Sequence, residues 1–246
     1  LHGAVEFYER CIENGIQPIL GCTFEVAWKS DSSKKEMVIV YAKGEKGYES
    51  LLKLSTLYQQ GLTWTKEMTE WIATHSEDVK IVFPPMDSEW VAAHSKGRLE
   101  AVLGAVKEEY ACVEIAVGIT REMVERGEFD TMRAGIEAAG VIPVAFSVSR
   151  YLNTTDYFPW KVLQAIRLGE TLSFTQEDAT GSESLPEATS MTKVFQTAEG
   201  GVLLTNLEQF TKDLVVEIPL RDTMLPKFPV PGGKTSAEFL YELCEA

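Results

Sequence analysis

The stretch IENGIQPILGCTFEVAW, residues 12–28, passes from the end of a helix into an apolar strand and sets the alternation on which the fold depends. Apolar residues recur at helical spacing over residues 3–14, and Gly15 follows as a C-cap. The PILGC segment has the form of an approach to a carboxylate metal ligand, but the residue after Cys22 is Thr23. The stretch therefore predicts a helix and a strand, and it raises the question of a lost metal site.

The same alternation continues along the chain. Further apolar runs predict strands at 36–43, 79–85, 110–118, 141–149 and 201–204. Amphipathic segments predict helices at 47–61, 66–75, 88–109, 120–139 and 151–169, and one more that is capped near Asn206. The polar hexapeptide KSDSSK, residues 29–34, predicts a turn between the first two strands.

Strands that are continuous apolar runs and alternate with helices are typical of a parallel sheet covered by helices. The sequence therefore predicts an α/β fold, either a sandwich or a barrel, and disfavours an antiparallel sandwich.

The C-terminal third is less regular. Residues 176–190 are acidic, rich in Ser and Thr and without periodicity, which predicts a mobile loop and the first site of protease cleavage. The last segment is punctuated by prolines and becomes helical from about Ser236, as in a linker that enters a further domain. The chain begins without Met and inside a helical pattern, which indicates a fragment of a longer protein.

The composition disfavours several classes of function and location. The 246 residues include 37 acidic and 23 basic side chains, a net charge of −14, which disfavours direct binding to a phosphate backbone. Four cysteines without a CxxC pair fit reduced thiols better than a disulfide framework. The apolar runs are too short to span a bilayer. We predict a cytoplasmic protein with no membrane and no nucleic-acid contact.

Motifs for nucleotide or metal chemistry are weak. GGKTS at 232–236 lacks the earlier glycine of a phosphate-binding loop, because Phe228 occupies that position, so a turn and a helix start are the better interpretation. The three histidines, His2, His75 and His94, lie on or beside predicted helices rather than at strand ends, where α/β folds gather ligands.

Two glutamates differ from the many acidic residues of solvated helix faces, because they lie in apolar strand patterns. These are Glu25 and Glu114. Glu114 has either a buried polar role or a place on an outer sheet face, since alternation along a strand allows both. The sequence fixes no second carboxylate opposite it, and no nucleophile elbow is present.

The order of segments resembles the PHP (polymerase and histidinol phosphatase) domain of the bacterial DNA polymerase III alpha subunits of the DnaE type, and among these the low-GC Gram-positive members. The resemblance runs nearly from end to end and is carried by HGAVEFYERCIENGIQPILGCTFEV, VIVYAKGEKGYESLLKLSTL, IPVAFSVSRYL, KVLQAIRLGETL and MLPKFPVP. It implies a PHP-type (β/α)7-like barrel, distorted and N-terminally incomplete, over residues 1–225. Residues 226–246 would be the linker and the start of the polymerase module.

Intact members of that family hold a trinuclear Zn or Mn cluster made of His, Asp, Glu and Cys, which supports phosphoester hydrolysis. The first two ligand motifs would precede Leu1, and the glycine-cysteine of the third is not recognisable in IVFPPMD. The remaining ligand positions fall on Thr23, Met37, Val148, Arg150 and Trp160, with Ser149 as the spacer of an expected Asp-x-His motif. These side chains do not supply the O, N and thiolate donors that such a cluster needs.

The resemblance therefore predicts no catalytic, cofactor-binding or metal-binding residue in this chain, and a non-catalytic scaffold within a replicative DNA polymerase. The implied partners are the polymerase module of the same chain and a proofreading exonuclease or other replisome protein, with Mg²⁺ expected in an absent palm domain. Two alternatives stay open. One is a metal-dependent phosphoesterase, pyrophosphatase or 3′–5′ exonuclease that uses Glu25, Glu114 or Cys22 with earlier residues. The other is an unrelated α/β-barrel enzyme.

Overall fold

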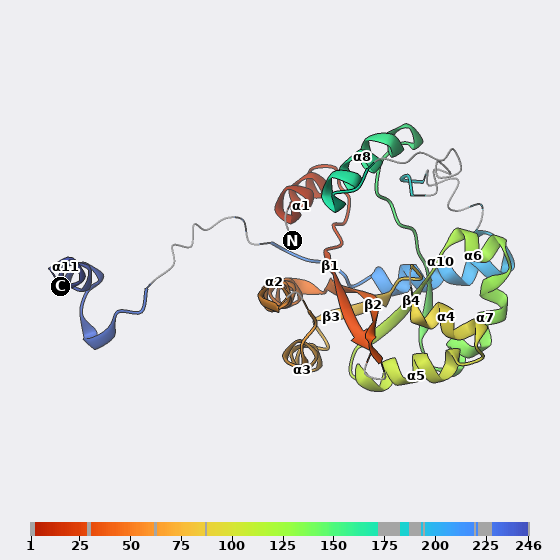
Figure 1. Ribbon diagram of the computed structural model, residues 1–246, viewed down its shortest axis with the longest axis horizontal. Coiled ribbons are helices and arrows are strands. Elements are labelled where there is room, and N and C mark those ends of the chain that lie inside the picture. The colour runs from red at the N-terminus through yellow and green to blue at the C-terminus, as the bar shows by residue number, and fades with distance from the viewer. Residues whose placement is uncertain are drawn as a thin grey trace.

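The computed structural model describes residues 3–28, 31–61, 63–86, 88–171, 183–186, 193, 195–218, 220 and 228–245 (Figure 1). The strands are β1 (Gly21–Trp28), β2 (Asp31–Ala42), β3 (Val79–Phe83), β4 (Glu114–Ile119) and β5 (Ile142–Ala145). The helices are α1 (Ala4–Glu13), α2 (Gly44–Gly61), α3 (Lys66–Thr74), α4 (Glu89–Ser95), α5 (Leu99–Glu109), α6 (Arg121–Glu125), α7 (Glu128–Ala138), α8 (Tyr157–Leu168), α10 (Ala198–Thr211) and α11 (Ser236–Glu245), with 3₁₀ turns η1 (Thr154–Asp156) and η3 (Pro231–Gly233).

The described strands form one mixed sheet in the order β1-β2-β3-β4-β5. The predicted α/β class is confirmed, but the sheet is parallel only from β3 to β5, because β2 pairs antiparallel with both of its neighbours. β2 already begins at Asp31, so the turn after β1 is shorter than the predicted 29–34. Such a short connection allows only an antiparallel hairpin, since a parallel pair needs a crossover of a dozen or more residues.

The two faces of the sheet pack against different sets of helices, although α10 contributes to both. One face contributes Val40, Ile81 and Val117 to the larger core, which α2 to α7 cover together with Leu203 of α10. The other face contributes Val82 and Val144 to a smaller core whose helical cover comes from α10. Alternation along each strand produces this division, because successive side chains point to opposite faces.

Most helix predictions are confirmed, and their ends follow ordinary capping chemistry. α1 is followed by Gly15, whose φ of 67° is the left-handed conformation that glycine adopts without strain. The hydroxyls of Thr65, Ser88 and Thr120 accept hydrogen bonds from the third residue after each of them, at the starts of α3, α4 and α6.

The predicted helix in this region is present as α10, but the predicted strand at 201–204 and the predicted cap near Asn206 were wrong. GVLL at 201–204 belongs to α10 rather than to a strand, and the N-cap is Thr197, whose hydroxyl accepts from the Gly200 amide at 3.1 Å. A run of four apolar residues fits a buried strand and a buried helix equally well. Asn206 lies inside the helix, where its side-chain amide donates to the Pro143 carbonyl at 2.8 Å and ties α10 to β5.

Several predictions fall on residues outside the described ranges. Of the predicted loop at 176–190, only 183–186 are described, and the proposed domain boundary at 225–226 lies in the undescribed stretch 221–227. The predicted helix at 151–169 is present as η1 and α8, and the helix predicted from Ser236 is α11. Among the described residues, no helix has the length and hydropathy that crossing a bilayer requires.

Candidate functional site

The segment that follows β5 carries two of the positions at which the family resemblance places metal ligands, Val148 and Arg150, with Ser149 between them. Val148 is half-buried, and Ser149 and Arg150 are exposed. The chain leaves the sheet here through a hydrogen bond from the Phe146 amide to the Ile119 carbonyl, at 2.8 Å. This is the carboxyl end of the parallel strands, where α/β folds usually place functional groups.

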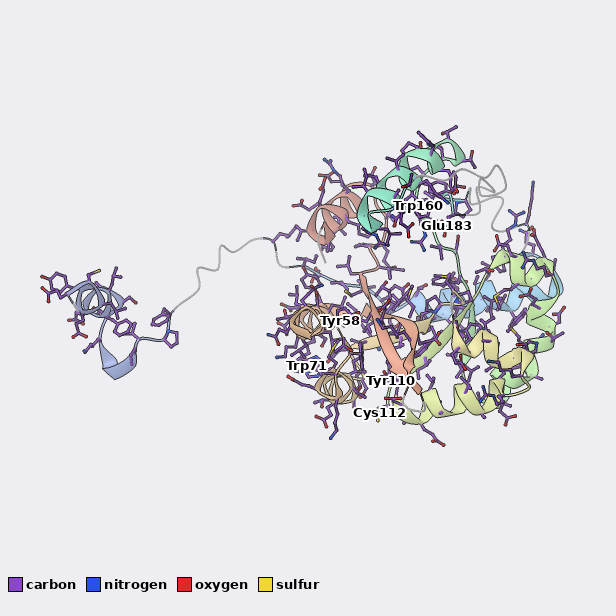
Figure 2. All side chains as sticks on the ribbon, viewed as in Figure 1. Tyr58, Trp71, Tyr110, Cys112, Trp160 and Glu183 are labelled. Carbon is purple, nitrogen blue, oxygen red and sulfur yellow. The ribbon has the colours of Figure 1, made fainter. Side chains whose placement is uncertain are left out.

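Arg150 makes the densest set of contacts in that segment. Its Nε donates to Glu183 Oε1 at 2.9 Å, and its backbone amide donates to the Glu183 carbonyl at 2.8 Å. The guanidinium carbon lies 5.6 Å from the centre of the Trp160 ring, within the range of a cation–π contact. Figure 2 labels Trp160 on α8 beside Glu183. Two of the aligned ligand positions, 150 and 160, therefore meet, and between them they present a fixed positive charge and an indole.

Thr23 and Met37 lie at the other edge of the sheet. Thr23 is an exposed residue of β1 opposite Ile39, and Met37 is a half-buried residue of β2 opposite Glu25. Neither a single hydroxyl nor a thioether is a strong ligand for a hard or borderline divalent cation. Within the described sheet, β3 and β4 separate β2 from β5, so the aligned positions form two groups rather than one.

The structure does not bring together in one site the residues named for the enzymatic alternative, Glu25, Cys22 and Glu114. Glu25 pairs across the hairpin with Lys35, at 2.8 Å between Oε2 and Nζ, and more than half of each side chain is exposed. Cys22 points to the opposite face, where it packs against the larger core, and burial raises the pKa of its thiol. A thiol that stays protonated is a poor ligand and a poor nucleophile.

Glu114 is the first residue of β4 and therefore lies at the amino end of the parallel strands. Its Oε2 forms an ion pair with Lys80 Nζ, at 3.0 Å. It also lines a cleft of about 470 Å³ together with the ion-paired Arg133 and Glu137 of α7. The amino end of the strands is where α/β folds place structural rather than catalytic groups.

Lys80 on β3 is a buried charged group with several partners, and its side chain is 5% exposed. Its Nζ donates a hydrogen bond to the Phe210 carbonyl at 2.9 Å and forms ion pairs with Asp213 Oδ1 at 2.7 Å and with Glu114 Oε2 at 3.0 Å. Phe210 lies in the last turn of α10, where a cation also interacts favourably with the helix dipole. Lys80 thus fixes the carboxyl end of α10 to the sheet.

Asp213 is the carboxylate that pairs both with Lys80 and with a second lysine, Lys43. Partial burial raises the pKa of its carboxyl, but hydrogen bonds and charge from Lys43 and Lys80 outweigh that effect and bring the pKa to about 2, below its ordinary value of 3.8. Lys43 Nζ lies 2.8 Å from Asp213 Oδ2. The carboxylate form is therefore stabilised in the folded state.

The lowered pKa of Asp213 predicts an acid-dependent loss of stability. The contribution of this carboxylate is fully present above the unfolded-state pKa of about 4 and is lost as the pH falls towards the folded-state value. We expect Asp213→Asn to be less stable than the wild type at pH 7 and the difference to shrink progressively between pH 4 and pH 2. Denaturant unfolding at several pH values measures this, and a difference that stays constant with pH would contradict the assignment.

The sheet face beneath α10 has a cavity of about 340 Å³, between the sheet and the loop after β5. Its polar lining residues are Tyr41, Ser147 and Thr211, and the remaining lining residues are apolar. Hydroxyl groups alone do not make a site for Zn or Mn. The donor chemistry of this cavity does not fit a metal cluster.

The histidines that the structure describes have local structural contacts. The His75 ring stacks on Trp71 with centroids 4.2 Å apart, and His94 Nε2 hydrogen-bonds Thr131 Oγ1 at 3.0 Å. His2 lies outside the described residues. Across the described ranges, no three His, Cys, Asp or Glu side chains are grouped as ligands for one metal ion.

GGKTS is a turn followed by a helix start, as the sequence predicts. Gly232 and Gly233 have φ values of 76° and 68°, and Thr235 caps α11. The Thr235 amide donates to Glu238 Oε2 at 2.8 Å, and the Glu238 amide donates to Thr235 Oγ1 at 3.3 Å, which together form a capping box.

Sequence reasoning missed Lys80, Asp213 and Glu183. One signal was available for Lys80, since it is the single charged residue inside the apolar run VKIVF. A lysine between apolar strand residues of a covered sheet is buried and needs acceptors. No comparable local signal marks Asp213 or Glu183, because their partners lie far away in the sequence.

Comparisons with known proteins agree with the resemblance. The profile of the PHP domain family matches residues 1–129. DNA polymerase III subunit alpha of Halalkalibacterium halodurans is 29% identical over the whole chain, and that of Bacillus subtilis is 23% identical over 99% of it. The protein of the same name from Chlamydia muridarum is 35% identical over 39% of the chain.

The chain spans 22% of the length of the Halalkalibacterium and Bacillus proteins. The family profile covers slightly more than half of the chain, from the helix before β1 to the start of α7. The helix-to-strand stretch at 12–28 and the paired strands β1 and β2 lie within this match. This chain therefore belongs to the PHP domain family.

Proposed function

We propose that this chain is the PHP portion of a bacterial replicative DNA polymerase of the polymerase III alpha type, and that it acts there as a metal-free scaffold. Its first partner in this proposal is the polymerase module of the same polypeptide, and a proofreading exonuclease or another replisome protein is a candidate for its exposed surfaces. The relatives that support this are named as alpha subunits and match this chain over its whole length. The proposal places the protein in the cytoplasm, without direct contact to DNA.

The observation that carries the scaffold role is the replacement of ligands by Arg150 and Trp160. A guanidinium stays protonated at any physiological pH, so a divalent cation at the same place would meet electrostatic repulsion. Arg150 is also held by Glu183, through side chain and backbone, and does not depend on a metal for its position. The residues present thus do not fit the cluster that the family resemblance implies. In this proposal, the Mg²⁺ chemistry of DNA synthesis belongs to a palm module outside this chain.

Metal analysis of the purified protein tests the proposal. After incubation with Zn²⁺ or Mn²⁺ and desalting, we expect no stoichiometric metal and no chelator-sensitive hydrolysis of a phosphodiester such as bis-p-nitrophenyl phosphate. A PHP protein with intact ligand motifs serves as the positive control. Retention of two or more metal ions per chain, together with chelator-sensitive hydrolysis, would establish the phosphoesterase alternative instead.

A double substitution examines the ligand positions directly. Val148→Asp with Arg150→His restores two donors, yet Thr23 and Met37 still offer none, so we expect the variant to bind no Zn²⁺ tightly. Ser149→Ala, at the intervening exposed position, is the matched control. Stoichiometric Zn²⁺ binding by the double variant, with the control unchanged, would show that the aligned positions are not those of a multinuclear cluster.

A further inference from the structure

The helix α8 is attached to the rest of the fold in an unusual way. None of its twelve residues is buried, and Phe158, Leu163 and Ile166 are between 52% and 72% exposed. Among the described elements, α8 packs extensively only against η1, which directly precedes it. An isolated helix of twelve residues is marginally stable in water, so the contacts at its first turns have a large influence on whether it stays in place.

Those contacts are aromatic and cationic. Tyr151, Tyr157 and Trp160 form a cluster with ring centroids 5.9–6.1 Å apart, which joins the chain after β5 to the first turn of α8. Arg150 lies over the Trp160 ring on one side and pairs with Glu183 on the other. The same arginine thus connects α8 to the short segment 183–186.

The segment 183–186 is held by backbone pairing as well. Tyr151 and Ser184 form a parallel β-bridge, with hydrogen bonds of 2.8 Å from the Arg150 amide to the Glu183 carbonyl and from the Leu185 amide to the Tyr151 carbonyl. The Arg150 and Glu183 side chains are 40% and 33% exposed. Solvent and salt therefore reach this pair, and its strength depends on ionic conditions.

We propose that Arg150, Trp160 and Glu183 form an electrostatic latch that holds α8 against the chain after β5 and is released by salt or by loss of either charge. The closed state is the one in the structure, with the guanidinium between the carboxylate and the indole. In the open state, Trp160 loses its contact with the guanidinium, and the amino end of α8 separates from the chain after β5. The latch needs no metal, and it is independent of the proposed scaffold role.

Trypsin reports the opening of the latch, because α8 contains Lys161 and Arg167. When opening and closing are fast relative to cleavage, the rate of cleavage follows the population of the open form. We expect Glu183→Gln and Arg150→Gln each to raise the initial rate of cleavage after Lys161 and Arg167 by about fivefold, which is the size of effect that a partly exposed ion pair supports. Mass spectrometry of early digestion products measures the two sites separately.

Three further measurements decide the result. Arg121→Gln removes a surface ion pair of matched geometry and exposure, 2.9 Å from Glu125, and should leave cleavage in α8 unchanged. The double variant Arg150→Glu with Glu183→Arg should be cleaved more slowly than either Arg150→Glu or Glu183→Arg alone. Adding 0.5 M NaCl should accelerate cleavage of the wild type and have little effect on Glu183→Gln. Unchanged cleavage in both Gln variants, or no recovery in the charge-swapped variant, would overturn the latch.

Discussion

Lys80→Met is expected to lower the free energy of unfolding by about 3 kcal/mol. The substitution keeps an unbranched chain of similar volume in the sheet and removes one hydrogen bond to a carbonyl and two ion pairs with carboxylates. The Phe210 carbonyl loses its buried donor, and Asp213 keeps only Lys43. The side chains of Glu114 and Asp213 are both 42% exposed, so water rehydrates these carboxylates in part when the lysine is removed. The expected loss of stability is therefore smaller than the largest values for breaking a fully buried ion pair. Urea denaturation followed by circular dichroism gives the value.

Lys46→Met is the matched control for this experiment. Lys46 lies on the exposed side of α2, so the same loss of charge should change stability by less than about 0.5 kcal/mol. Asp213→Asn and the double variant with Lys80→Met complete a cycle, in which the two losses should add up to more than the loss in the double variant. If Lys80→Met were as stable as the wild type, Lys80 would not fasten α10 to the sheet.

The alternation of strands and helices could be predicted because it depends on short stretches of neighbouring residues. Periodicity identified each strand of the described sheet and most helices, and N-cap residues such as Thr65 and Ser88 mark where helices begin. Strand direction was not predictable in the same way. The sequence of β2 is a buried apolar stretch like that of β3, yet the two strands are antiparallel. The direction of a strand depends on how the chain returns to the sheet and not on the residues of the strand itself.

The candidate site, too, could be predicted from the sequence only in part. The loss of ligands at Thr23 and Arg150 is visible in the sequence, because it depends only on residue identity at positions that the family resemblance fixes. What replaces the ligands is not visible there. Arg150 meets Glu183 after a separation of 33 residues, and Lys80 meets the Phe210 carbonyl after 130. Such pairs depend on the packed positions of whole elements, so they are found only once the chain is folded.

Gly47→Ala is expected to destabilise the protein by about 1–3 kcal/mol, although the same change usually stabilises a helix. Gly47 is buried in the first turns of α2. A methyl group there would lie in contact with the Asp78 carbonyl oxygen and 3.1 Å from the backbone of Ala42. The Asp78 carbonyl cannot move away freely, because it accepts a hydrogen bond from the Lys43 amide at 2.8 Å and so joins the ends of β2 and β3. Relief of the overlap requires α2 to shift away from the sheet, with a loss of packing along the helix.

Gly104→Ala separates this steric effect from helix propensity. Gly104 lies inside α5, and an added methyl group there meets no atom within 4 Å. The substitution should therefore stabilise the protein by about 0.5–1 kcal/mol, as alanine does in an unobstructed helix interior. Thermal and denaturant unfolding of the two variants should give changes of opposite sign. If both variants were more stable than the wild type, α2 would not approach the β2–β3 junction as closely as the structure shows. If both were less stable, the loss would come from replacing a helical glycine in general and not from the contact with Asp78.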